Sequence, residues 1–268
     1  MGGGGLAAMA RWPAVIVVAW LFPASLPAAE WGNLTMRFVY DGMPPVAKPI
    51  AAAAGPAGAG CGKGPFVEER LVVNPKDKGI ANVCVWLLRT SSEPAPAIHE
   101  SYAKTAKDKV TMTNKSCRFE PRILVVRTSQ TLVGANGDPT GHNMKASFFN
   151  NPEFNENIPA GAQILKSLAK PESAPSPVNC GMHPWMGGYL IVRDDPYASV
   201  SDASGRVTLA NLPAGQWTFV VWHESGYVTK AKQGGQAQDW GRNGRVKITI
   251  QPGDNDRGEF LLPADEFP

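Results

Sequence analysis

The chain has 268 residues, of which 43% are hydrophobic, and this is enough apolar material for one large packed domain or two ordinary ones. Its 26 basic and 23 acidic residues are scattered along the chain and leave a formal net charge of +3. This composition excludes a disordered chain, and the lack of a Lys/Arg block or of interleaved basic and aromatic residues excludes a nucleic-acid-binding protein.

The first 29 residues have the organisation of an export signal. A Gly-rich start is followed by a single charge at Arg11, an apolar stretch over 12–22 and small residues through Ala28 and Ala29. The apolar stretch is too short to span a bilayer. We therefore expect a signal peptide at 1–29 and a mature protein in the periplasm or elsewhere outside the cytoplasm. The alternative is an uncleaved signal that anchors the chain to the membrane.

Residues 30–109 are expected to form the first part of a β-sandwich. Short apolar runs rich in Val, Ile and Thr, with many Gly and Pro residues between them, indicate strands joined by turns. The predicted strands span 34–40, 70–73 and 80–88. A Pro/Gly/Ala-rich stretch at 44–64 predicts a flexible loop or linker, and the polar residues at 91–109 have room for one short helix.

The rest of the chain is predicted to be a denser series of short strands. In residues 110–196 the spacing suits a sandwich, and these strands span 110–113, 122–128, 130–136, 145–149, 163–168 and 188–192. Residues 197–268 continue with strands at 198–202, 206–209, 217–222, 245–250 and 259–262. Turn sequences at 202–205 and 212–215 separate the first of these. Helix is the minority throughout, so the predicted fold class is all-β.

Four cysteines occur in a chain that we expect to be exported, where disulfides are allowed. Cys84 lies in an apolar strand, where a buried free thiol is the ordinary interpretation. Cys61 and Cys117 both lie beside loop residues, so we pair them in a disulfide. Sequence alone cannot fix the connectivity, and other pairings stay open. The fourth, Cys180, is better explained as a metal ligand.

The segment Cys-Gly-Met-His-Pro-Trp-Met at 180–186 carries the chain's clearest chemical signature. It spaces the thiol of Cys180, the imidazole of His183 and the thioether of Met186 three residues apart, so one tight loop can direct three donors at one ion. His142, one of only four histidines, stands in a turn-rich loop and supplies a fourth donor. Two His, one Cys and a weak axial Met are the ligands of blue-copper electron-transfer sites. The set therefore predicts one type-1 copper ion.

Other kinds of site fit the sequence less well. A structural zinc site would use Cys and His alone and leave Met186 without a role, and a c-type haem needs Cys-x-x-Cys-His, which is absent. An ordinary core cysteine would not explain why His142 and His183 fall at the two ends of a strand-rich block. His223 is interpreted as structural and His99 as solvated. With no histidine left for a second copper centre and no Gly-x-Ser-x-Gly motif, we expect no enzymatic activity.

Residues 110–196 resemble a cupredoxin. The segment at 180–186 is similar to the ligand loop of amicyanin and pseudoazurin-like proteins, which has Cys, His and Met at these intervals and Pro after the His. The stretch Asn-x-Asp to His-Asn at 136–143 is similar to their first-histidine loop. The resemblance implies a Greek-key sandwich that holds copper between these two loops.

The resemblance also implies roles for residues around the ligands. Asn143 would tie the two ligand loops together. His183 would be a partly exposed ligand through which electrons enter, with Pro184 and Trp185 forming an apolar rim. A redox partner protein would then dock near His183 and Trp185.

The whole chain resembles exported bacterial proteins labelled methylamine-utilisation-like. The elements that carry this resemblance are Gly-Ile-Ala-Asn-Val-Cys-Val-Trp at 79–86, Cys-Arg-Phe-Glu-Pro at 117–121, His-Pro-Trp-Met at 183–186 and Trp-His-Glu at 222–224. This chain departs from the pattern at Arg122, where a histidine is expected, and at Cys84, which is atypical within its strand.

The flanks of the cupredoxin-like block resemble a carboxypeptidase-regulatory or transthyretin-like β-sandwich. Our hypothesis is that the cupredoxin, 110–196, is inserted into one sandwich formed by 30–109 and 197–268. Two separate small units are the alternative. Contacts between 82–88 and 206–221 would distinguish these arrangements.

Together these patterns predict an exported type-1 copper protein that carries single electrons between Cu(I) and Cu(II) and catalyses no reaction. The alternative is a non-catalytic copper-binding or scaffold protein of the cell envelope. The expected partner is a redox protein, with no nucleic acid, and with the membrane only if the signal is uncleaved.

Overall fold

The computed structural model describes residues 1–4, 30–51, 58–62, 66–89 and 95–268. Within them the regular structure is almost entirely β, with short 3-10 helices at η3 (Glu100–Thr105) and η4 (Ala264–Glu266), which confirms the all-β fold class. The expected export signal at 1–29 lies, after residue 4, outside the described residues, as do 52–57 and 63–65 of the predicted loop. Among the described residues, no helix has the length and apolar character needed to cross a membrane.

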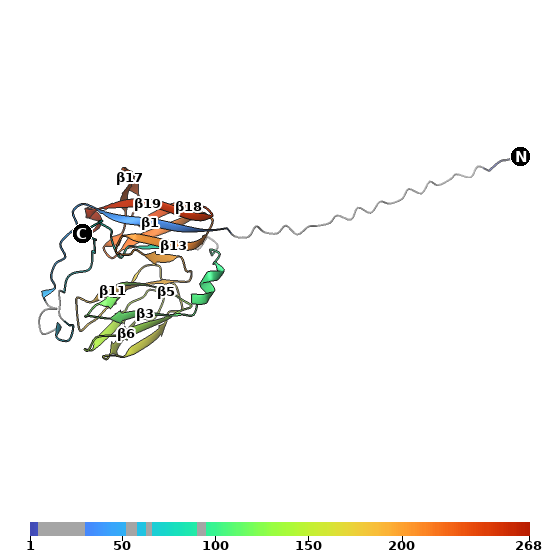
Figure 1. Ribbon diagram of the computed structural model, residues 1–268. Coiled ribbons are helices and arrows are strands. Elements are labelled where there is room, and N and C mark those ends of the chain that lie inside the picture. The colour runs from blue at the N-terminus through green and yellow to red at the C-terminus, as the bar shows by residue number, and fades with distance from the viewer. Residues whose placement is uncertain (5–29, 52–57, 63–65, 90–94) are drawn as a thin grey trace.

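Strands from both ends of the chain form one β-sandwich, which we call the flanking sandwich. One sheet has the order β13 (Arg206–Pro213), β1 (Trp31–Asp41), β19 (Gly253–Pro263), β16 (Lys230–Gln233) and β17 (Gln236–Asp239). The other has the order β12 (Ala198–Val200), β2 (Cys84–Leu87), β14 (Gly215–His223) and β15 (Gly226–Tyr227), with β18 (Arg245–Ile250) paired to β14. Figure 1 shows these strands as the upper part of the molecule.

Alternation along β1 explains how this sandwich acquires its core. Leu34, Met36 and Phe38 occupy every second position and are fully buried, as expected for a strand with one face on the core. Their side chains join those of β2, β13, β14, β18 and β19 in one hydrophobic cluster. Burial of such side chains stabilises the fold by roughly 1.5–3 kcal/mol each.

In the flanking sandwich, strands that precede the central block pair with strands that follow it. Strand β2, which precedes the central block, pairs with β14, which follows it, in a register that sets Trp86 opposite Val220. Strand β1 likewise pairs with both β13 and β19. A single sandwich interrupted by an insertion requires such contacts, and we propose that division of the chain, with 110–196 as the insertion.

The central block forms a second sandwich, which we call the central sandwich. Its first sheet has the order β4 (Phe119–Glu120), β3 (Lys109–Asn114), β6 (Thr131–Asn136) and β9 (Gln163–Ser167). Its second has the order β5 (Ile123–Arg127), β11 (Gly187–Arg193), β10 (Ser176–Asn179), β7 (His142–Ala146) and β8 (Phe154–Ile158). Apolar side chains between the two sheets make a separate core.

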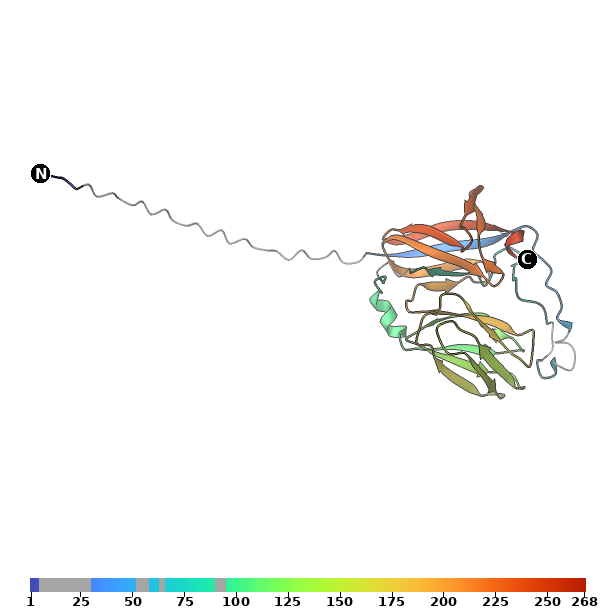
Figure 2. The same ribbon diagram turned by 180° about the vertical axis from the view of Figure 1, so that it is seen from behind.

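The two sandwiches pack sheet against sheet. A third apolar cluster, between β2 and β14 on one side and β5 and β11 on the other, consists of Cys84, Trp86, Ile123, Ile191, Val220 and Trp222. Beside it, Arg122 of the central sandwich donates two hydrogen bonds, of 2.8 and 3.0 Å, to the carboxylate of Glu224. Figures 1 and 2 show the two sandwiches stacked, with η3 along one side of their junction.

The chain enters and leaves the central sandwich at neighbouring points. Tyr102, in η3 on the way in, and Tyr197, just before β12 on the way out, pack edge to face with ring centroids 5.9 Å apart. The Tyr102 hydroxyl also donates to the carbonyl of Ala210 in β13, at 2.7 Å. The junction is therefore held at this end by aromatic and polar contacts.

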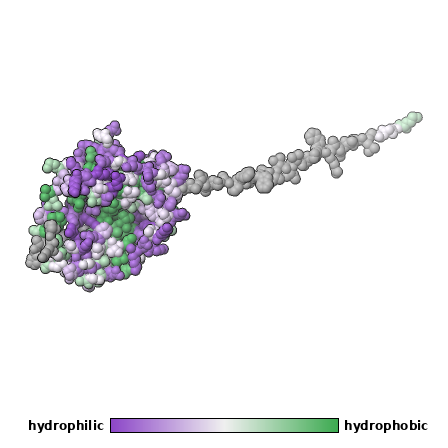
Figure 3. All heavy atoms as spheres, in the orientation of Figure 1, coloured by the Kyte–Doolittle hydropathy of each residue, from purple (hydrophilic) through white to green (hydrophobic). Residues whose placement is uncertain are grey.

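Several strands differ from the sequence predictions. Residues 70–73 form no strand and contribute only the bridge from Val73 to Ile80. Strands β4, β8, β10, β15, β16 and β17 were not predicted; the three central residues of β8 are polar, and β10 contains Pro177. Hydrophilic residues cover most of the face seen in Figure 3, where apolar residues gather near the middle.

Candidate metal centre

Three neighbouring strands bring the two predicted ligand loops to one end of the central sandwich. Strand β7 begins at His142, β10 ends one residue before Cys180, and β11 begins directly after Met186. Since β10 pairs with both β7 and β11, with Asn179 opposite Lys145 on one side and Gly187 on the other, the loops emerge side by side.

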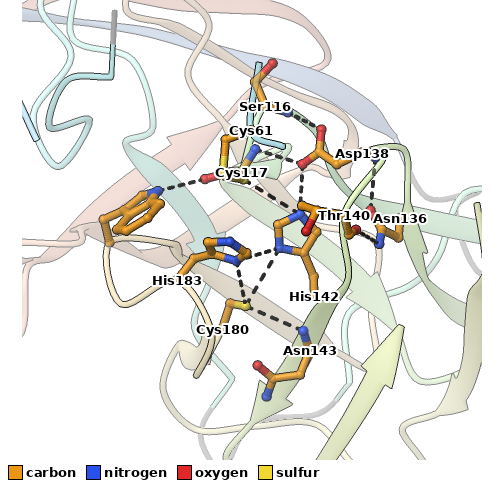
Figure 4. Close-up of a disulfide and its surroundings, with 11 residues drawn as sticks. Cys61, Ser116, Cys117, Asn136, Asp138, Thr140, His142, Asn143, Cys180 and His183 are labelled. Carbon is orange, nitrogen blue, oxygen red and sulfur yellow. Dashed lines mark hydrogen bonds and ion pairs between the residues drawn. A yellow bond between two sulfur atoms is a disulfide. The ribbon is translucent and has the colours of Figure 1, made fainter. Parts of the chain in front are cut away.

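His142, Cys180 and His183 converge in space, and all three are buried (Figure 4). The Nδ1 atoms of the two histidines are 3.0 Å apart. The Sγ of Cys180 lies 3.9 Å from the Nδ1 of His142 and 3.7 Å from the Nδ1 of His183. Three donors placed about 2.0–2.3 Å from one ion have spacings of this size, so the triangle fits a metal ion with S and N ligands.

Met186 lies next to this triangle. It is buried in the same apolar cluster as Cys180. Its N–H donates to the carbonyl of His183 at 2.8 Å, and its carbonyl accepts from the N–H of Cys180 at 3.3 Å. These two bonds close the segment from Cys180 to Met186 into a compact loop, which fixes where its donors stand.

Asn143 connects the two ligand loops. The side-chain oxygen of Asn143 accepts from the N–H of Gly181 at 2.6 Å, and its backbone N–H donates to the Sγ of Cys180 at 3.5 Å. The first bond orders the loop that carries the thiol, and the second stabilises negative charge on the sulfur.

Asp138 orients His142 from the far side of the ring. The Nε2–H of His142 donates to the Asp138 carboxylate at 2.9 Å, and both groups are buried. With the proton held on Nε2, the lone pair of Nδ1 points at Cys180 and His183, which is the tautomer that a metal ligand needs. This role of Asp138 was not predicted from the sequence. The available signal was a carboxylate four residues before the histidine in a turn-rich loop.

The hydrogen bonds also shift the pKa values of the two donors. Burial by itself raises the pKa of the Cys180 thiol, but hydrogen bonds from His142 and from the backbone of Asn143 and His183 lower it below the ordinary value of a cysteine. Burial lowers the pKa of His142, but its bonds to Cys180 and Asp138 raise it overall. The pocket therefore favours thiolate, the form of cysteine that binds metals.

Cys61 and Cys117 form a disulfide that closes one wall of the site, with their Cα atoms 5.1 Å apart. The Cys117 Sγ lies 3.9 Å from the Nε2 of His142. Its carbonyl accepts from the indole N–H of Trp185 at 3.2 Å, and the Trp185 ring packs 5.3 Å from that of His183.

This wall makes one expectation wrong. His183 was expected to be partly exposed, yet only 5% of it is accessible to solvent. The disulfide and the Trp185 ring both lie against it. Met182, one residue earlier, is 45% exposed and stands at the surface instead.

No protein-family model matches the sequence, and no curated protein sequence matches it. Among solved structures, the purple cupredoxin from Nitrosopumilus maritimus is 19% identical, covers 32% of this chain and 99% of its own, and gives a TM-score of 0.27. Amicyanin from Paracoccus versutus is 16% identical, with 41% and 97% covered and a TM-score of 0.28. The copper-containing nitrite reductase from Thermus scotoductus SA-01 is 19% identical, with 40% of this chain and 25% of the reductase covered and a TM-score of 0.28.

These neighbours include cupredoxins, and each match leaves more than half of this chain uncovered. At such identities and TM-scores they carry no argument about function.

Proposed function

We propose that this protein is a type-1 copper protein that carries single electrons outside the cytoplasm and catalyses no reaction. The observation that carries the proposal is the buried triangle formed by the Nδ1 atoms of His142 and His183 and the Sγ of Cys180. Thiolate and imidazole donors favour copper over hard ions, and Met186 beside them suits a weak axial ligand. Copper bound there would supply one-electron exchange between Cu(I) and Cu(II).

The chain's own residues would keep the donors still during that exchange. Asp138 holds the ring of His142, Asn143 holds the loop that carries Cys180, and Met186 closes that loop with backbone bonds. Donors that are fixed before the metal binds need little rearrangement between its two oxidation states, so electron transfer meets a low barrier. Burial keeps water from adding further ligands.

Cellular location and partner belong to the same proposal. The sequence of residues 1–29 and the disulfide between Cys61 and Cys117 both suit an oxidising compartment such as the periplasm. We propose that a redox partner protein docks near Trp185, where Met182 is exposed.

A second function is favoured by one observation. Since His183 is covered, the route from the metal to the surface is longer than an exposed ligand would give. A copper-binding or scaffold protein of the cell envelope, without electron transfer, would need no such route.

Absorption spectroscopy and voltammetry after Cu(II) addition test both functions. An electron carrier should show an intense thiolate-to-copper band in the visible and reversible reduction. Cys180→Ser should abolish the band, and Met186→Gln should keep copper and shift the potential. Cys84→Ser, at a buried thiol of the flanking sandwich, should change neither. A colourless adduct would contradict type-1 copper, whereas a coloured but irreducible one would favour the scaffold.

A further inference from the structure

The disulfide wall contains donors of its own. Ligand atoms of Cys61, Cys117 and His183 lie within 4.8 Å of one another, and all three residues are buried. The sulfurs are joined in the structure, so they offer no thiolate while the disulfide is intact. What matters is whether the two sulfurs would stay in place once the bond is reduced.

Cys117 is held by contacts that do not depend on the disulfide. Ser116 and Cys117 both adopt φ of 51°, in the left-handed region, which points their N–H groups the same way. Both N–H groups donate to the Asp138 carboxylate, at 2.6 and 2.8 Å. Successive N–H groups that surround an anion in this manner form a stable concave turn. With the Trp185 bond to its carbonyl, the backbone of Cys117 makes two hydrogen bonds, and that of Ser116 beside it makes a third, none of which involves the sulfur.

Cys61 is held by its neighbours in the chain. Gly60, at φ of 91°, packs so closely on Thr140 that an added Cβ would lie 2.9 Å from the Thr140 Cβ. The N–H of Cys61 donates to the carbonyl of Gly58 at 2.9 Å, which makes a tight turn. Thr140 belongs to the loop between Asn136 and His142, and Figure 4 shows it beside the disulfide. Cys61 is therefore fixed against the first ligand loop by packing as well as by its sulfur.

We infer that the reduced protein has a second metal site, made by the thiolates of Cys61 and Cys117 and a nitrogen of His183, which takes a soft monovalent ion, Cu(I). Two thiolates on one ion stand about 3.8 Å apart for metal–sulfur bonds of about 2.3 Å. Since both residues stay anchored, the sulfurs need to separate by less than about 2 Å from their bonded distance of about 2.0 Å. Two thiolates and one imidazole are soft donors that select Cu(I).

Formation of this site is a redox step followed by a proton release. An external dithiol gives two electrons and two protons to the disulfide, the sulfur–sulfur bond breaks, and the dithiol becomes a disulfide itself. Binding of Cu(I) then displaces the two thiol protons to solvent. His183 belongs to both donor groups, so the two sites share one ligand.

The experiment uses the full chain with Cys180→Ala, which removes the thiolate of the first site and separates this inference from the proposed function. One sample stays oxidised; the other is reduced with a water-soluble phosphine and desalted without oxygen. Each is titrated with Cu(I) against a coloured Cu(I) chelator. The reduced sample should hold one Cu(I) at least about 100-fold more tightly, because a lost ligand costs more than the 10- to 100-fold cost of a lost outer partner.

Matched variants identify the ligands. In the same background, Cys117→Ser and His183→Gln should each remove the added affinity, whereas Cys84→Ala should not, since Cys84 is buried in the other sandwich. X-ray absorption of the Cu(I) sample should show two sulfur ligands and one nitrogen ligand. Equal affinity in the two redox states, or affinity that depends on Cys84 or ignores His183, would overturn the inference. Copper that binds only after the near-ultraviolet circular dichroism of the folded chain is lost would overturn it too.

Discussion

The two sandwiches of this chain share an architecture and differ in what they bury. Within the described residues of the flanks, Ser201 and His223 are the buried polar side chains, and the rest of that interior is apolar. The central sandwich buries many more, and most of them gather at the end where its ligand loops meet: Asn114, Asn136, Asp138, His142, Asn143 and His183.

This difference sets apolar packing in one sandwich against a polar cluster at one end of the other. Polar side chains are costly to bury unless they are hydrogen-bonded, and at the loop end Asp138 and Asn143 bond to the groups around them. The flanking sandwich takes its stability mainly from apolar packing. Mutations in the flanks should therefore change stability, and mutations at the loop end should change metal binding.

The largest effect is expected in the flanking core. Phe38 is 0% exposed, and Phe38→Ala should lower the free energy of unfolding by about 4 kcal/mol, through lost burial and the cavity left behind. Urea unfolding would measure it, and the copper spectrum of the folded protein should be unchanged. Phe149→Ala is the matched control, because Phe149 is 81% exposed and should change stability very little. An altered spectrum in Phe38→Ala would contradict the separation of roles.

The next effect concerns the ion pair that joins the sandwiches. Burial raises the pKa of Glu224 while the Arg122 guanidinium opposes this shift, so Arg122→Met leaves a buried carboxylate without its partner. We expect the free energy of unfolding to fall by about 3 kcal/mol. Calorimetry should then show the two sandwiches unfolding in separate transitions.

Two controls sharpen this prediction. Adding Glu224→Leu to Arg122→Met should restore most of the loss, because no unpaired charge then remains buried. Lys230→Met breaks an exposed pair with Asp265 and should cost less than about 1 kcal/mol. A loss that persists in the double variant would show that Arg122 acts through packing instead.

A smaller effect is expected at the loop end. Asp138→Asn keeps the shape of the side chain but weakens the bonds to His142 and to the N–H groups of Ser116 and Cys117. Metal affinity should fall by about 10- to 100-fold, as for other outer partners of ligating histidines. A chelator competition would measure it, with Asp265→Asn, at an exposed carboxylate, as the control. Unchanged affinity would mean that the ring of His142 is held by packing alone.

The effect that is smallest at neutral pH concerns the buried histidine of the flanks. Burial, with help from the charges of Arg122 and Arg70, lowers the pKa of His223 to about 3 in the folded protein, against about 6.5 when unfolded. Between these values the unfolded chain binds more protons, so the free energy of unfolding falls as the pH falls, by at most about 1.4 kcal/mol per pH unit. Above pH 6.5 His223 contributes no slope. In His223→Phe the urea midpoint should depend less on pH from 6.5 down to 3; an identical pH profile would contradict this.

Sequence patterns predicted the longer strands of both sandwiches and missed several short ones in each. The predicted strand at 245–250 coincides with β18, and the turn at 212–215 separates β13 from β14, because turn residues and alternation act locally. Strand β10 carries Pro177, which lacks an N–H and normally argues against an interior strand, yet β10 lies between β11 and β7. Its position depends on long-range pairing that a local pattern does not contain.

The candidate site was predictable only where its residues are close in sequence. Cys180, His183 and Met186 are close in sequence, so one loop reveals them. The roles of Asp138 and of the disulfide depend on contacts with Ser116 and with the segment around Gly60, which sequence spacing does not indicate. The burial of His183 was missed because its cover comes from a distant segment.

The contact between Tyr102 and Tyr197 has a consequence for how the chain can be re-engineered. A segment whose two ends lie this close can be removed, and a short linker can rejoin the chain without moving the strands on either side. The same geometry lets a different domain be spliced in at the same two points. The central sandwich is therefore a candidate for exchange as one unit, because the flanking sandwich has its own core.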